Sequence, residues 1–106
     1  MEMHKSRRLE LHEKLVDILG SRNVYFQPPE SLKLKFPCII YNFDLADTIK
    51  ANDRNYRIYD RYQITYVTKD PEDSKIDEFL EAFQMISMDR HFTSDNLNHY
   101  IYSLFY

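Results

Sequence analysis

The sequence has little glycine, little cysteine and no tryptophan. Its only glycine, Gly20, leaves no Gly-rich loop that could cradle a phosphate group. Its only cysteine, Cys38, excludes an internal disulfide framework and any metal site built from several cysteines. Neither a G-x-S-x-G nor an H-E-x-x-H motif is present. The sequence therefore favours a protein that is not an enzyme, and we expect Cys38 to be a buried free thiol.

Long apolar runs are also missing, and no run reaches the roughly 18 residues that a transmembrane helix needs. The first residues are charged and lack the apolar core of a signal peptide. We therefore expect a chain that folds in a reducing cytoplasm without contacting a membrane. Hydrophobic residues make up 43% of the 106 residues, which is enough for a single domain (residues 1–106) with one core. The nine tyrosines are either half-exposed strand residues or part of an interface.

The histidines do not form a compact ligand pattern. Two of them, His91 and His99, could face each other across a hairpin and bind a metal together with Asp89 or Asp95. Ordinary polar residues of a hairpin are the simpler interpretation. We expect neither a metal nor a cofactor.

Residues 58–68 show the longest strand-like alternation in the chain. Ile58, Tyr62, Ile64 and Tyr66 would share one face, because side chains alternate across a strand with period two. The segment is rich in the β-branched and aromatic residues that strands favour. We expect it to be the central strand of a sheet.

The remaining helices and strands can be assigned relative to this strand. Residues 4–19 form an amphipathic helix that ends at Gly20. Residues 70–74 start a second helix, with Asp70 as the cap or, in a second register, Ser74 with Asp77. The core face of this helix is expected to carry Ile76, Phe79, Leu80 and Phe83. Further strands are expected at residues 24–26, 37–46, 85–92 and 97–106. The predicted fold is α+β: a mostly antiparallel sheet of four or five strands, two helices on one face, and a long basic β-hairpin joining strands 37–46 and 57–68.

Charge is unevenly distributed along the chain, whose net charge is −3. Residues 31–69 carry seven Lys and Arg against four Asp and Glu, whereas residues 70–106 carry two against eight. A basic middle and an acidic end suit copies that meet front to back. The alternative is that both charged segments are simply solvated.

Several phrases of the sequence resemble one family across nearly the whole chain. The more specific are NVYFQPP at residues 23–29, RYQ at residues 61–63, DRHF at residues 89–92 and DNLNH at residues 95–99. With the basic hairpin between them, they resemble the tail-terminator (tail-completion) proteins of long-tailed bacteriophages and prophages.

The resemblance implies a structural virion protein without catalytic residues. Such proteins assemble into a ring, usually of six copies, that caps the tail tube, stops its polymerisation and presents the head-to-tail joining surface. The implied partners are further copies of the chain, the major tail tube protein and a head-completion or connector protein, with DNA passing through the bore without specific binding. The implied location is the head-proximal end of the tail, after assembly in the host cytoplasm. Alternatives are a neck or head-completion ring protein and a small non-catalytic binding module.

The predicted interface combines charges with aromatic residues. Lys50, Arg54, Arg57 and Arg61 would meet Asp77, Glu78 and Glu81 of a neighbouring copy or of the tail tube. Exposed pairs contribute only about 0–1 kcal/mol each, so they would set orientation. Buried aromatic residues would supply most of the affinity, with Tyr100 and Tyr102 as the candidates in the last strand.

Overall fold

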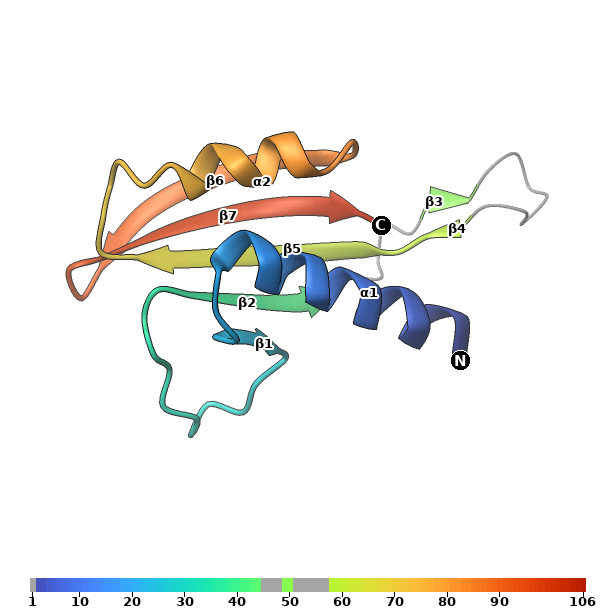
Figure 1. Ribbon diagram of the computed structural model, residues 1–106, viewed down its shortest axis with the longest axis horizontal. Helices are drawn as coiled ribbons and strands as arrows, with labels where there is room; N and C mark the ends of the chain where they lie inside the picture. Colours follow the sequence, from blue (N-terminus) through green and yellow to red (C-terminus); the bar gives the residue numbers. More distant parts are fainter. Residues whose placement is uncertain (1, 45–48, 51–57) are drawn as a thin grey trace.

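The strand predicted to be central lies in the middle of a five-stranded sheet of order β1-β2-β5-β7-β6 (Figure 1). The computed structural model describes residues 2–44, 49–50 and 58–106. The strands of this sheet are β1 (Val24–Phe26), β2 (Cys38–Phe43), β5 (Arg61–Thr68), β6 (Ile86–Ser94) and β7 (Leu97–Phe105). β1 runs parallel to β2, and the other neighbours are antiparallel. The predicted α+β fold with a mostly antiparallel sheet is confirmed.

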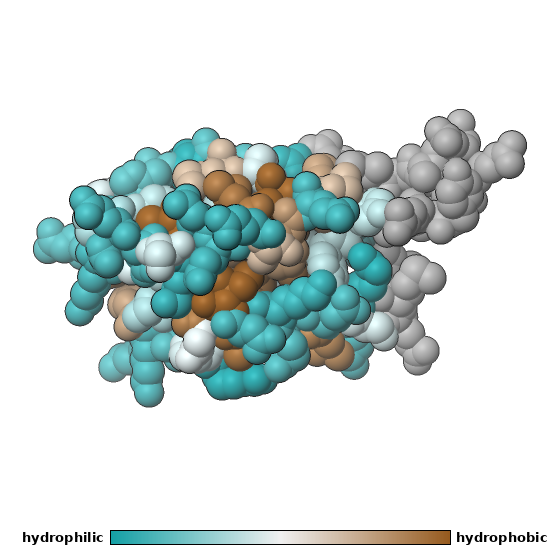
Figure 2. Space-filling model, turned by 45° about the horizontal axis from the view of Figure 1, so that its top comes forward, coloured by the Kyte–Doolittle hydropathy of each residue, from teal (hydrophilic) through white to brown (hydrophobic). Residues whose placement is uncertain are grey.

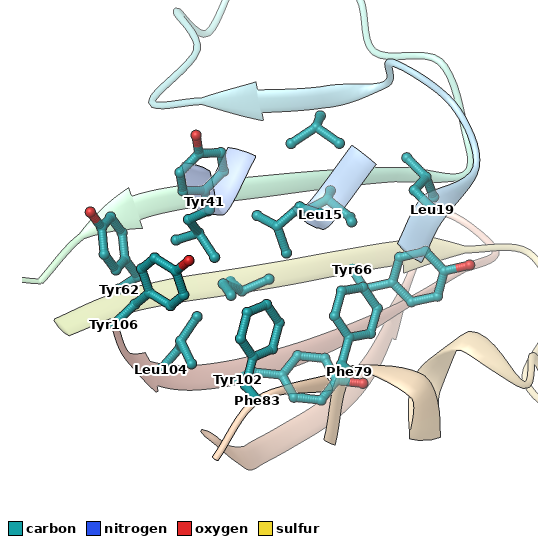
Figure 3. Packing of buried hydrophobic residues seen from close by; sticks show 14 of the residues in the cluster. Leu15, Leu19, Tyr41, Tyr62, Tyr66, Phe79, Phe83, Tyr102, Leu104 and Tyr106 are labelled. Carbon is teal, nitrogen blue, oxygen red and sulfur yellow. The ribbon is translucent and has the colours of Figure 1, made fainter. Parts of the chain in front are cut away.

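Two helices, α1 (Glu2–Leu19) and α2 (Lys75–Ala82), lie on the same face of this sheet (Figure 1). The register brings Tyr41, Ile64 and Tyr102 side by side on neighbouring strands, and all three are fully buried. Leu11 and Leu15 of α1 belong to the same cluster. Figure 3 shows Leu15 gathered with Tyr41 and Tyr102 over the strands. The core therefore lies between the helices and one face of the sheet.

Tyrosines of the sheet fasten the α2 segment through their hydroxyl groups. Tyr66 Oη donates a hydrogen bond to Asp73 Oδ2 (2.5 Å), Tyr100 Oη to the carbonyl of Pro71 (3.0 Å) and Tyr102 Oη to the carbonyl of Ile76 (2.9 Å). Their rings pack in the core, where Phe79 of α2 lies 5.3 Å from the Tyr66 ring and 5.1 Å from the Tyr102 ring. A tyrosine suits this role because its ring is apolar and its tip requires a hydrogen-bond partner when buried.

The start of α2 differs from the prediction. The helix begins at Lys75, and residues 70–74 form turns in front of it. Ser74 is the N-cap residue but makes no side-chain cap; the amide of Lys75 donates instead to Asp73 Oδ1 (2.9 Å). Leu80 was wrongly assigned to the core face, because the sheet covers only the side of the short helix that carries Phe79, and Leu80 is 37% exposed.

The strand predicted over residues 58–68 is divided at Asp60. β4 (Ile58–Tyr59) pairs with β3 (Ile49–Lys50) in a separate two-stranded ladder, which is the described part of the basic hairpin. The amide and carbonyl of Asp60 instead pair with the carbonyl and amide of Tyr106 (3.3 and 2.9 Å). In Figure 1 the ladder lies beyond the end of β7, away from α2. The predicted strand 37–46 is described only as Cys38–Phe43, and residues 45–48 lie outside the described part.

The last hairpin follows the prediction closely. β6 and β7 are joined by Asp95 and Asn96, whose positive φ values of 54° and 63° belong to the left-handed region that tight two-residue hairpin turns require. Along β7, Asn98, Tyr100, Tyr102 and Leu104 are buried, while the alternate residues are half-buried. Because both helices lie on one face, these alternate residues belong to the sheet face that neither α1 nor α2 covers.

Candidate interaction surface

The acidic residues predicted in the second helix lie together on its outer side. Asp77, Glu78 and Glu81 are all exposed, because Phe79 between them occupies the side that faces the sheet. Among the described residues, no cation lies within ion-pair distance of any of the three carboxylates. The outer side of α2 is thus an uncompensated acidic surface, as the sequence predicted.

α1 extends this acidic surface across the space between the two helices. An open hollow of about 370 Å³ is lined by Asp17 and Ile18 of α1 and by Glu78, Glu81 and Ala82 of α2. A second hollow of about 340 Å³ lies next to it and also contacts Ala82. It is lined by Arg7 and Lys14 of α1, Tyr59, Ala82, the segment Phe83–Met85, Phe105 and Tyr106.

This second hollow, which we call the basic hollow, is built around the ring of Tyr106. The Arg7 guanidinium lies 4.9 Å and Lys14 Nζ 5.0 Å from the centre of this ring. The hydroxyl of Tyr106 donates to Glu10, and this hydrogen bond lowers the pKa of the Glu10 carboxyl despite the opposing effect of desolvation. Interaction with the same hydroxyl raises the pKa of Lys14, so the cation is kept. Lys14 Nζ also lies 3.8 Å from Glu10 Oε1, and Arg7 Nε donates to the carbonyl of Tyr106 (3.4 Å). Counted over these side chains, two cations against one carboxylate give this end of the surface a surplus of one positive charge.

Of the basic residues predicted to meet the acidic helix, the structure describes Lys50 and Arg61, and both lie away from that helix. Lys50 belongs to β3, and Arg54 and Arg57 lie outside the described residues. Arg61 lies on the sheet face that neither α1 nor α2 covers, because it alternates with the buried Tyr62 along β5. Its Nη2 donates to Ser103 Oγ (3.1 Å), and its Nε lies 3.6 Å from Asp44 Oδ2. Arg61 and the acidic side of α2 therefore occupy opposite faces of the same chain.

The two tyrosines predicted at an interface are part of the core. Tyr100 is 5% exposed and Tyr102 is fully buried, and their hydroxyls bond to the chain itself. Burial raises the pKa of both hydroxyls, so each remains a donor at neutral pH. The two residues therefore form no part of the surface proposed below.

The contribution of α1 was missed by the sequence reasoning. Arg7, Lys14 and Ile18 are spaced seven and four residues apart, so they share one side of the helix next to the buried stripe of Leu11 and Leu15. This spacing is visible in the sequence. What could not be read from the sequence is that α2 lies beside that side of α1.

The two histidines considered as metal ligands point to opposite sides of the last hairpin. His91 pairs with Tyr100 across the hairpin and stacks on its ring at 4.4 Å, whereas His99 pairs with Phe92 and stacks on it at 4.7 Å. They therefore do not face each other. Within residues 2–44, 49–50 and 58–106, no group of three His, Cys, Asp or Glu side chains could hold a metal ion. The helices of this part of the chain are also too short or too polar to cross a membrane.

Comparisons of the chain with protein-family models, with curated proteins and with solved structures gave no match.

Proposed function

We propose that the chain is a structural protein of a bacteriophage virion: a tail terminator that forms a ring at the head-proximal end of the tail tube. The proposal starts from the resemblance of residues 23–29, 61–63, 89–92 and 95–99 to that family. It is supported by the α+β fold, which agrees with the small subunits of such rings.

The observation that carries the proposal is the separation of the two charged surfaces. The acidic side of α2 lies on the helix-covered face, and the ladder that begins the basic hairpin extends beyond the end of the sheet (Figure 1). Opposite charges on different sides of one subunit can pair only between subunits. Such a front-to-back contact closes into a ring when the rotation that relates neighbouring subunits is a whole fraction of a full turn, and it otherwise forms a filament.

In this proposal the protein acts through assembly with its partners and not through catalysis. Lys50, Arg54, Arg57 and Arg61 of one copy would orient it against Asp77, Glu78 and Glu81 of the next copy or against the major tail tube protein. The completed ring, of six copies in this family, would stop tube growth and offer its free side to a head-completion or connector protein. The chain carries a net charge of −3, so a bore lined by it would let DNA pass without gripping it.

The test is tail length in the bacteriophage that encodes the chain, with and without this protein. Tails that lack it should be overlong and unjoined to heads, and the wild-type chain supplied in trans should restore both properties. The double variant Glu78→Lys/Glu81→Lys should fail to restore them. The matched control Glu30→Lys/Glu72→Lys changes two carboxylates that are equally exposed but lie off the helix, and it should succeed.

Tails of normal length without the protein would overturn the proposal. Normal rescue by the double variant at low salt would overturn the charge pairing. Labelled protein found on heads and absent from tails would instead assign the chain to the neck or head-completion ring.

A further inference from the structure

Two adjoining hollows, one between α1 and α2 and one beyond the end of α2, form a groove with opposite charges at its two ends. The helices run in opposite directions side by side on the sheet (Figure 1), and both hollows described above share Ala82. Arg7 and Lys14 line one end, and Asp17, Glu78 and Glu81 line the other. The polarity therefore runs along the groove within a single face of the molecule.

The middle of this groove is apolar. Ile18 of α1 and Ala82 of α2 line it. Figure 2 shows apolar side chains in the middle of the helix-bearing face, surrounded by hydrophilic ones. An apolar strip with a polar rim is the usual composition of a protein interface, in which the strip supplies affinity and the rim supplies orientation.

We propose that this groove is the contact surface of a two-fold dimer between copies of the chain. The two-fold axis lies in the plane of the contact and is perpendicular to the groove. A rotation of 180° about it turns the two faces toward each other and places the positive end of one copy on the negative end of the other. Every contact then occurs twice: Arg7 and Lys14 of one copy meet Glu78 and Glu81 of its partner, and the reverse. The apolar strips of the two copies lie against each other at the centre.

The position of both charges on one face decides in favour of a two-fold arrangement. A front-to-back ring needs complementary surfaces on different sides of the subunit, whereas a two-fold contact needs one surface that complements itself. Nucleic acid is disfavoured as an occupant, because the three carboxylates would repel its phosphates. A second copy carries the complementary pattern in full.

The dimer does not depend on the proposed tail function. If both hold, Glu78 and Glu81 can serve only one contact at a time, and a free dimer would keep the acidic side of α2 covered until the chain reaches the tube. Lys14 contributes only to the dimer, so a variant at this position separates the two contacts.

The experiment is sedimentation of the full chain over a range of concentrations, in about 0.1 M and about 1 M salt, where the Debye length falls from about 10 Å to about 3 Å. We expect a monomer–dimer equilibrium whose Kd rises with salt. Lys14→Glu and Glu81→Lys should each raise Kd by about tenfold or more, which equals about 1.4 kcal/mol, because each reversal acts at two places in the dimer. Circular dichroism checks that each variant is folded.

An equimolar mixture of the two single variants is the decisive sample. In the mixed dimer the reversed charge at position 14 of one chain meets the reversed charge at position 81 of the other, and the second pair is the native one. Both pairs then join opposite charges, so the heterodimer should recover the wild-type Kd. The double variant Lys14→Glu/Glu81→Lys should recover it as well. The control variants Lys33→Glu and Glu30→Lys change exposed charges in the connection between β1 and β2 and should leave Kd unchanged.

Several results would overturn the dimer. These are a monomer at every concentration, a dimer whose Kd no groove variant alters, and single variants whose mixture stays monomeric. A larger oligomer that depends on the same residues would assign the groove to the ring contact and refute the two-fold arrangement. Because Lys14→Glu should still restore tail length in the assay above, failure of the dimer and failure of the tail function are separate results.

Discussion

Replacing Tyr66 with Phe tests whether hydroxyl groups of the sheet hold α2 in place. The variant keeps the ring that packs on Phe79 at 5.3 Å and removes only the hydrogen bond to the Asp73 carboxylate. Hydrogen bonds to charged groups contribute about 1.5–3 kcal/mol net, and neutral ones about 0.5–1.5 kcal/mol. We therefore expect Tyr66→Phe to lower the free energy of unfolding by about 1.5–3 kcal/mol, more than Tyr102→Phe, which loses only a bond to a carbonyl.

Urea unfolding followed by far-ultraviolet circular dichroism measures both variants. The chain has no Trp, and fluorescence would depend on the mutated tyrosines themselves. At about 4 °C per kcal/mol for a domain of this size, Tyr66→Phe should lower Tm by about 6–12 °C. Tyr25→Phe is the control, because the Tyr25 hydroxyl has no hydrogen bond within the described part of the chain. A Tyr66→Phe variant no less stable than Tyr102→Phe would refute the reasoning.

Three further predictions concern pH, thiol reactivity and the end of α1. Burial raises the pKa of the Asp73 carboxyl, but hydrogen bonds from Tyr66, the Lys75 amide and Thr68 outweigh it, so the pKa lies below its usual 3.8. Its stabilisation is present above that value and lost as pH falls through the folded-state pKa, so the wild-type and Tyr66→Phe unfolding curves should converge below about pH 4. Burial raises the pKa of the Cys38 thiol from 9.0 to about 11, so alkylation by iodoacetamide at pH 8 should be at least about 100-fold slower in the native chain than in urea, and equal rates would refute this. Gly20→Ala should lower the free energy of unfolding in urea by about 1–2 kcal/mol, because Gly20 has φ +79°, which a residue with a Cβ adopts only under strain. An added Cβ would meet nothing within 4 Å, so the whole effect should come from the backbone conformation. Ser21→Ala is the matched control, and an equal effect of both substitutions would contradict a backbone cause.

Local patterns were sufficient where one periodicity dominates. The alternation of Tyr62, Ile64 and Tyr66 correctly predicted the central strand. This prediction succeeded because a one-residue shift of the strand would expose its entire apolar face.

The errors arose where the deciding contact is distant in sequence. Residues 70–74 offer two ways to start a helix, and the sheet selects the later one, because Tyr66 and Thr68 hold the Asp73 carboxylate. The helical spacing of Leu80 is compatible with a core position, but an eight-residue helix presents only a narrow stripe to the sheet.

Only half of the candidate surface could be predicted from the sequence, for the same reason. The acidic side of α2 follows from consecutive residues, whereas the groove is made by two helices more than fifty positions apart in the chain. Composition likewise could not show whether the hydroxyl of a tyrosine meets a partner molecule or its own backbone. The structure shows the second case for Tyr100 and Tyr102.

The position of β7 in the sheet also affects the order in which a newly made chain can fold. β7 comes after every other strand in the sequence, yet it lies between β5 and β6. Until the ribosome has delivered it, β5 has one bare edge and β6 has no neighbour to join. During synthesis the nascent polypeptide therefore holds an unfinished half-sheet whose open side could capture the same strand from another nascent chain.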